Sequence, residues 1–234
     1  MASTDIRKNI LGIVNEARQK FALDSVSALT ADKESKLMVE ILNDVIDEVS
    51  DYGDWKEMIR EIQVTASSSV SDYIIETSAL VKNIHEVVFG DDISPMWLTT
   101  FDDILRLNRI SSYSRPRQWA IIGVDASSAN PKIRAFPIPS SAENNETFKV
   151  TYYEKPRLYT TSDVSAVPQF ASRVLVAGLI AKKCLEESGG APTQQYAAYQ
   201  ADYQNRLKEE YNRLNADSGS DTYFRPAYGK YRRK

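Results

Sequence analysis

The hydrophobic positions follow a helical spacing near both ends of the chain and a two-residue spacing between them. In four segments apolar side chains recur at steps of three and four residues, which is the period of an amphipathic helix. The pattern therefore predicts helices over residues 6–21, 38–52, 168–187 and 193–215. The second helix is expected to follow Thr30 or Asp32, and Pro168 suits the first turn of the third.

Three of these helices have distinctive faces. Residues 168–187 carry apolar side chains in all directions, so this helix is expected at the buried centre of its domain. The helix over 38–52 has a wide apolar stripe on one face and a row of carboxylates on the opposite face. That row is formed by Glu40, Asp44, Asp47, Glu48 and Asp51. The helix over 193–215 has one narrow stripe, formed by Tyr196, Tyr199, Tyr203, Leu207, Tyr211 and Leu214.

The tyrosine-rich stripe has two interpretations. Its rings either pack on the helix over 168–187, or some of them reach a neighbouring subunit, where amphipathic aromatic side chains are common. Trp55, which follows Tyr52-Gly53-Asp54 at the end of the second helix, is expected to cap the core.

The middle of the chain, from about residue 58 to 159, alternates between apolar and polar residues. The alternation around Ile62, Trp119 and Val150 predicts half-buried strands. A short helix over about residues 100–108 is expected to interrupt them, with Asp102 and Asp103 in its first turn.

Two runs near the end of this region predict a hairpin. Asn144-Asn145 lies between the apolar runs 133–138 and 148–153, as a turn between paired strands would. Pro137 and Pro139 place the first of these strands at a sheet edge, because proline cannot donate a hydrogen bond to a neighbouring strand.

The predicted fold is mainly α with a β insertion (α+β). Residues 1–57 and 160–216 are expected to form a four-helix bundle, which a β-rich insertion over 58–159 interrupts. An extended tail over 217–234 follows the last helix.

The tail combines aromatic rings with cations at a density that is unusual for a solvated segment. Exposed rings gain nothing that offsets the entropy lost on ordering. Rings and guanidinium groups together are typical of a surface that binds a partner, which favours a docking peptide over a frayed basic end. The residues concerned are Tyr223, Phe224, Arg225, Tyr228, Tyr231, Arg232 and Arg233.

The charge distribution argues against a reader of duplex DNA. The net charge is −3, and residues 217–234 contribute +3 from five cations and two carboxylates, so the rest of the chain carries −6. A duplex-binding protein would instead carry its cations on the folded surface. The single cysteine, Cys184, excludes an internal disulfide and is expected to be buried. We expect a soluble protein without signal peptide or membrane span, made in a reducing compartment.

No motif in the sequence predicts a catalytic, cofactor-binding or metal site. His85 is the only histidine and is expected to be structural. Gly189-Gly190 lacks the strand and the Lys that a phosphate-binding loop requires. The adjacent carboxylates Asp91-Asp92, Asp102-Asp103 and Glu186-Glu187 are poor candidates for a glycosidase pair, which must flank a cleft.

Taken together, the layout of the chain resembles the head-to-tail adaptor (head-completion) proteins of tailed bacteriophages, especially the short-tailed kind that includes tail tubular protein A. The resemblance rests on the helix ending in Tyr52-Gly53-Asp54-Trp55, the run Phe148-Lys149-Val150-Thr151-Tyr152-Tyr153 and Val167-Pro168-Gln169-Phe170 before the buried helix. It includes the long tyrosine-bearing helix and the extended tail. The segments 66–71, 111–117 and 125–132 have no counterpart in it.

The resemblance implies a structural virion protein at the head–tail interface, made in the host cytoplasm. Such proteins form a ring, generally dodecameric, below the portal, and the genome passes through it. The tail would dock on the portal protein, and the β insertion would face the tail nozzle or tail fibre proteins. The carboxylate row is then either a solvated face or the lining of the channel, where like charge prevents double-stranded DNA from sticking. No enzyme activity, cofactor, membrane partner or sequence-specific DNA binding is implied.

Two other classes remain as alternatives. An adaptor-associated cell-wall (peptidoglycan) hydrolase would need two carboxylates across a cleft, one with a raised pKa. A nucleic-acid-binding accessory protein would use the rings and cations of the tail for stacking, with strongly salt-dependent affinity.

Overall fold

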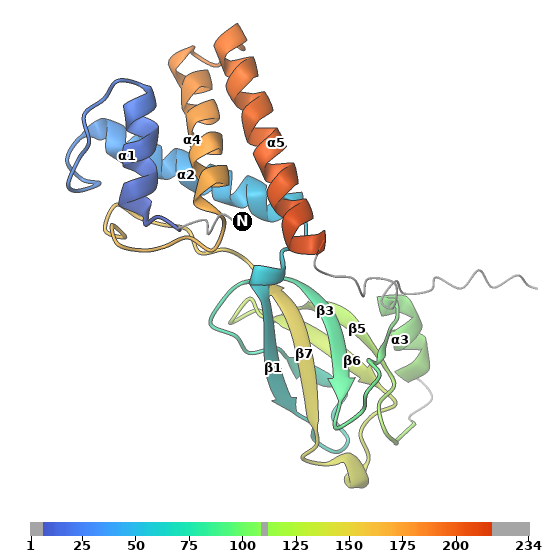
Figure 1. Cartoon of the computed structure of the whole chain (residues 1–234). Helices are drawn as coiled ribbons and strands as arrows, with labels where there is room; N and C mark the ends of the chain where they lie inside the picture. Colours follow the sequence, from blue (N-terminus) through green and yellow to red (C-terminus); the bar gives the residue numbers. More distant parts are fainter. Residues whose placement is uncertain (1–6, 109–111, 217–234) are drawn as a thin grey trace, which may run out of the picture. The chain divides into compact units, whose positions relative to one another are not determined.

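The computed structural model describes residues 7–108 and 112–216, which divide into two compact units. The first unit contains the described residues up to Glu57 and from Arg157 onward, and the second is Met58–Pro156. Figure 1 shows the helices of the first unit and the sheets of the second.

One buried helix organises the first unit. The helices of this unit are α1 (Ile10–Lys20), α2 (Lys33–Tyr52), α4 (Ser172–Glu187) and α5 (Gln194–Ala216). Helix α4 contacts α1, α2 and α5, and nearly all of its apolar side chains are buried. The prediction that this segment is the buried centre is therefore confirmed. Helix α2 begins after Asp32, one of the two predicted caps, whose side chain accepts a hydrogen bond from the backbone N–H of Ser35.

The helices approach one another most closely at Gly178 of α4. A Cβ atom at this position would lie 2.6 Å from Cγ1 of Val45 on α2 and 2.9 Å from the ring of Tyr203 on α5. Only hydrogen fits at that distance. Trp55 closes one end of the same core: it is 3% exposed, and its indole N–H donates to the Val49 carbonyl at 2.7 Å, so the expected cap is confirmed.

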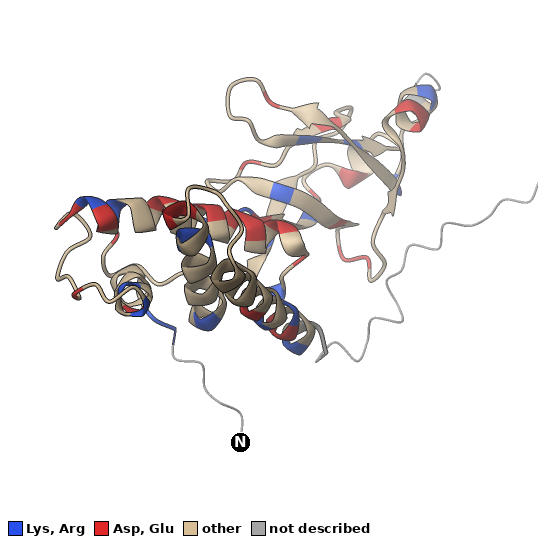
Figure 2. Cartoon of the chain, turned by 90° about the horizontal axis from the view of Figure 1, so that it is seen from above, with Lys and Arg blue, Asp and Glu red and all other residues tan. Residues whose placement is uncertain are grey.

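The predicted four-helix bundle interrupted by a β insertion is wrong. Helix α2 runs across α4 and α5 instead of alongside them, as both views of the molecule show (Figures 1 and 2). The physical reason is the wide apolar stripe of α2, which buries residues from Ser35 to Ser50 and so covers several neighbours rather than one narrow seam. A fifth helix, α3 (Phe101–Asn108), lies in the second unit, and the described strands form two sheets, so the fold is an α+β mixture. Helix α4 begins at Ser172, four residues after Pro168, because the preceding loop pairs with α1 through the N–H of Ile10 and the carbonyl of Ala166.

The second unit is built from two sheets around a main apolar core, with a smaller apolar cluster of Ile104, Ala120 and Phe136 beside α3. The antiparallel sheet contains β1 (Ile59–Thr65), β7 (Thr147–Glu154) and β3 (Val81–Phe89), in that order. The other sheet contains β2 (Asp72–Ile74), β6 (Pro131–Phe136), β5 (Gln118–Val124) and β4 (Trp97–Leu98), with β4 parallel to β5. The core draws side chains from both sheets, with Phe148 packed between Tyr73 and Phe89 at ring separations of 4.7 and 4.8 Å. The predicted short helix is confirmed as α3, and the Thr100 hydroxyl accepts from its Asp103 N–H at 3.2 Å.

The predicted hairpin at Asn144-Asn145 is wrong. Strands β6 and β7, which this turn would join, belong to different sheets. The prediction of an edge position is also wrong, because β6 lies between β2 and β5. Pro137 and Pro139 follow the last residue of β6, Phe136, and so remove no hydrogen bond from either neighbouring strand.

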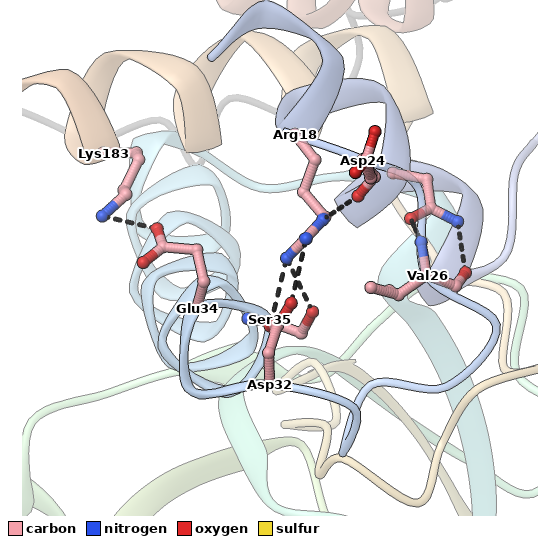
Figure 3. Close-up of polar contacts among 8 residues, drawn as sticks. Arg18, Asp24, Val26, Asp32, Glu34, Ser35 and Lys183 are labelled. Carbon is pink, nitrogen blue, oxygen red and sulfur yellow. Dashed lines mark hydrogen bonds and ion pairs between the residues drawn. The ribbon is translucent and has the colours of Figure 1, made fainter. Parts of the chain in front are cut away.

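A buried arginine joins α1, α2 and the loop between them (Figure 3). Arg18 is 4% exposed, and its Nε donates to the Asp24 carbonyl at 2.7 Å. Its Nη1 donates to Asp32 at 3.1 Å and to the Ser35 hydroxyl at 3.0 Å, while Nη2 pairs with Asp32 at 2.9 Å. The hydrogen bond from the Ser35 backbone, then that from its hydroxyl, and the guanidinium group together lower the pKa of Asp32. The start of α2 is thereby fixed to α1.

Further polar side chains hold this unit together. Lys183 on α4 is 3% exposed, and its Nζ pairs with Glu34 of α2 at 2.6 Å (Figure 3). The same Nζ pairs with Glu186 at 2.6 Å. Asn43 bonds to both backbone groups of Tyr159, each at 2.8 Å, which ties the long loop before α4 to α2. These contacts fix α2 at both its N-terminal end and its middle.

Replacing Leu179 by aspartate is expected to abolish folding. Leu179 is completely buried on α4, so Leu179→Asp would place an unpaired carboxylate in an apolar environment. Circular dichroism should show no cooperative thermal transition. The control Gln204→Asp adds the same group at an exposed position of α5 and should melt like the wild type. A cooperative transition at the wild-type temperature for Leu179→Asp would contradict the assigned core.

Replacing Asp32 by asparagine should lower the Tm at neutral pH, because a charge-assisted contact to buried Arg18 is lost while asparagine still caps the helix. The pKa of Asp32 is lower in the folded state, so its contribution is present above the unfolded pKa of about 4 and lost as the pH falls through the folded pKa. The difference in Tm between wild type and Asp32→Asn should therefore shrink between pH 7 and pH 3. Asp24→Asn, which keeps the carbonyl that Arg18 uses, is the control and should change Tm little. If the Tm difference between wild type and Asp32→Asn did not change with pH, the ionised carboxylate of Asp32 would not contribute to stability.

Candidate interaction surface

The predicted carboxylate row occupies the outer face of α2. Glu40, Asp44, Asp47 and Asp51 are all exposed, and none forms an ion pair with another described residue. They follow one another at steps of four, three and four residues, which places them on one side of a helix. Figure 2 shows acidic residues along this helix. The result is an uncompensated strip of negative charge.

Glu48, the fifth predicted member of the row, lies at its margin. Its side chain is 37% exposed and pairs with Lys182 of α4 at 3.0 Å. It also faces the phenol of Tyr203: burial first, and the charge of Glu48 second, raise the pKa of Tyr203. The carboxylate of Glu48 is thus turned toward the interior of its unit, unlike the other four.

The tyrosine-rich stripe of α5 divides into a buried part and a half-buried part. Tyr203 and Leu207 are buried against α4, as the core interpretation predicts. Tyr211 is half-buried and packs edge-on to Tyr52 and Trp55, with ring centroids 5.3 Å apart in both pairs. The C-terminal turns of α5 therefore lie against the C-terminal end of α2.

A buried ionic cluster on α5 was not predicted from the sequence pattern. Glu210 is 2% exposed and pairs with Arg173 of α4 and with Arg213. Burial alone would raise the pKa of Glu210, but the two guanidinium groups outweigh it and the pKa is lowered. The available signal was its position three residues after Leu207, which places Glu210 on the buried stripe.

The adjacent carboxylates have structural partners. Asp92 forms a bidentate pair with Arg115 at 3.0 and 3.1 Å, Asp103 accepts from the Thr100 hydroxyl at 2.8 Å, and Glu186 pairs with Lys183. His85 lies on an exposed position of β3, edge-on to Tyr153 at 5.6 Å. These side chains are held in separate places by separate partners.

One open depression of about 450 Å³ does carry carboxylates, Glu76 and Asp125. The hydroxyls of Ser127 and Ser128 lower the pKa of Asp125, and Lys132 pairs with it at 3.3 Å. A hydrolase of the kind considered above needs the opposite, a carboxyl group whose pKa is raised so that it can donate a proton. The lowered pKa of Asp125 therefore does not suit it as the proton donor that the hydrolase alternative requires.

The predicted docking residues of the tail, from Tyr223 to Arg233, lie outside the described residues. Within the described part of the chain, no group of three or more His, Cys, Asp or Glu side chains is placed to hold a metal ion. No described helix is long and apolar enough to cross a membrane.

Comparison with known proteins relates both units to one family. The model of the SU10 adaptor protein family matches residues 8–228, which includes the helices, the sheets and part of the tail. Among curated proteins there is no match. The match bears out the resemblance to phage head–tail adaptors and covers nearly the whole chain. The chain thus belongs to the SU10 adaptor protein family and has the structural role of a phage adaptor at the head–tail junction.

Proposed function

We propose that copies of this chain form a closed ring, generally of twelve subunits, that joins the portal to the tail nozzle and conducts the genome. The proposal rests on the family match for the adaptor role. One observation supports a DNA channel lined by this chain. It is the row formed by Glu40, Asp44, Asp47 and Asp51, which are exposed and form no ion pair with another described residue.

The acidic face of α2 lines the channel in this proposal. DNA carries one negative charge per about 1.7 Å of axis, so an acidic wall repels it and prevents tight contacts during passage. Screening limits this repulsion to a Debye length of about 8 Å at physiological salt, so the wall acts only when the duplex comes close. Such a wall requires a helix that is held firmly in place. Arg18 binds the cap residue Asp32, Lys183 binds Glu34 of α2, and Asn43 of α2 binds the loop at Tyr159, so α2 is held at three points.

The segment 217–234 docks on the portal. Its four aromatic side chains would fill grooves of the portal, and Arg225, Arg232 and Arg233 would pair with carboxylates there. Ordering such a segment costs about 1–2 kcal/mol of backbone entropy per residue, so several anchors are needed. The β-rich unit would contact the nozzle or fibre proteins of the tail.

The ring of subunits is expected to form only on the portal, which serves as its template. A head-to-tail contact between subunits closes into a ring only if the rotation between them is correct, and otherwise produces fibres. A portal ring supplies that rotation and favours the bound state by mass action. We therefore expect a largely monomeric free protein.

Electron microscopy of the protein mixed with portal rings tests the function directly. The full chain should add a closed ring of density to the portal, whereas a chain that ends at Ser218 should not attach, because its anchors are absent. Thermal melting of the shortened chain checks its folding and should give a Tm close to that of the full chain. Wild-type attachment by the shortened chain would contradict portal docking by this segment, and failure of the full chain to attach would contradict the function itself.

Reversing charges on α2 should make the assembled channel bind DNA. In Asp44→Lys/Asp47→Lys, four units of charge change per subunit, and phosphate contacts replace repulsion. Retention of short duplex DNA by portal–adaptor complexes should rise on the order of tenfold and should fall steeply with salt. The control Glu61→Lys/Asp202→Lys makes the same change at exposed positions of β1 and α5. Equal retention by both variants would contradict a channel lined by α2.

A further inference from the structure

The outer face of α2 and the segment 217–234 are complementary in charge, and α5 brings the start of this segment to the end of α2. We propose that in the free protein this segment lies on the acidic face of α2 of its own chain. Only the release of this contact, by attachment to the portal, rests on the proposed function.

Tyr211 places the C-terminal part of α5 next to the C-terminal end of α2. Its ring is edge-on to Tyr52 and Trp55, and a Cβ atom on Gly53 would lie 2.4 Å from it. Helix α5 ends at Ala216, five residues and about 8 Å further along its axis. The segment 217–234 therefore begins near the C-terminal end of α2.

The segment is long enough to cover the whole row. From Asp51 back to Glu40 the row extends over eleven residues of helix, about 16 Å. Eighteen residues in extended form reach about 60 Å. This length allows the segment to pass around the end of α2, whose diameter with side chains is about 10–12 Å, and to run along its outer face.

The chemistry of the two surfaces matches. The face presents four carboxylates that form no ion pair with another described residue, and Tyr52 beside Asp51 is 43% exposed. The segment offers five cations against two carboxylates, interleaved with four aromatic rings. Arginine and lysine can pair with the row, while a tyrosine or phenylalanine ring can pack on Tyr52.

Each ion pair between the segment and α2 would be weak, but the covalent attachment of the segment favours their formation. Exposed ion pairs are individually weak and are screened by salt. Because the segment is covalently attached, its local concentration at α2 is in the millimolar range, which several weak pairs can exploit. The contact is thus easily exchanged for a better partner.

The consequence is a self-masking device. In the free protein the segment neutralises the acidic face and is itself bound, so weak non-specific partners of either surface must compete with this contact. When the segment binds the portal instead, the carboxylates of α2 become exposed, and the assembled channel then has its acidic wall. Docking and the exposure of the channel wall are thereby coupled in one exchange.

Carbodiimide cross-linking of the full chain tests this contact without any portal. The reagent joins a lysine amine to a carboxylate in direct contact, so Lys230 and Lys234 should become linked to Asp44, Asp47, Asp51 or Glu40 in the monomer fraction, as identified by mass spectrometry. Raising the salt to about 1 M, where the Debye length is about 3 Å, should lower the yield on the order of fivefold.

Variants of the full chain provide the controls. Arg225→Glu/Arg232→Glu/Arg233→Glu keeps both lysines and the whole of α2 and should lower the yield as strongly as salt does. Lys20→Glu/Arg106→Glu/Arg117→Glu makes the same charge change at exposed positions elsewhere and should keep the wild-type yield.

Three results would overturn the contact. They are an absence of these cross-links in the monomer, their restriction to dimers, and equal linkage of the two lysines to Glu61 on β1. Each of them can be observed whether or not the protein attaches to a portal. Failure to attach, in contrast, concerns only the proposed function.

Discussion

The first unit depends on the close approach of three helices at Gly178. With no side chain at that position, Val45 of α2 and the ring of Tyr203 on α5 both reach the backbone of α4. This contact determines which face of α2 is buried. Because the apolar stripe of α2 must face α4, the carboxylates on the opposite side are directed outward, and Glu48 at the margin is left to pair with Lys182. The most prominent surface of the unit is thus a consequence of how its core packs.

The buried charges of this unit hold segments that are far apart in the sequence. Arg18 fixes the loop before α2, Lys183 joins α4 to Glu34, and Glu210 joins α5 to Arg173. A buried charge is expensive to desolvate and is tolerated where opposite charges and hydrogen bonds surround it. Each of these three side chains meets that condition. Their contribution is to fix the positions of loops and helix ends, which apolar packing leaves less well defined.

An adaptor must present defined surfaces to unlike neighbours, and the two units differ in what they present. The helical unit has a broad acidic face on a helix that is fastened at several points. The β-rich unit has a continuous aromatic core and exposes large apolar side chains on and next to the short strand β4, among them Trp97 at 73% and Leu98 at 62%. Exposed aromatic and aliphatic side chains of this size are typical of surfaces that bind other proteins. Both units lie within the match to the SU10 adaptor protein family.

Features that depend on local periodicity could be predicted from the order of residues alone. The central helix was evident because residues 174–181 are apolar on every side, the start of α2 because Asp32 is a good cap, and the acidic face because its carboxylates recur at helical steps. The layout of the whole chain also sufficed to suggest the adaptor family, and the family match bears this out.

How these elements pack against one another could not be predicted in this way. That α2 crosses α4 and α5, that β6 and β7 enter different sheets, and that Lys183 and Glu210 are buried all depend on partners distant in the sequence. Periodicity shows which side of a helix or strand is apolar, but the angle at which two apolar surfaces pack is set by the shapes of both. The pairing of strands follows from the same non-local competition, because a run of alternating residues fits more than one neighbour.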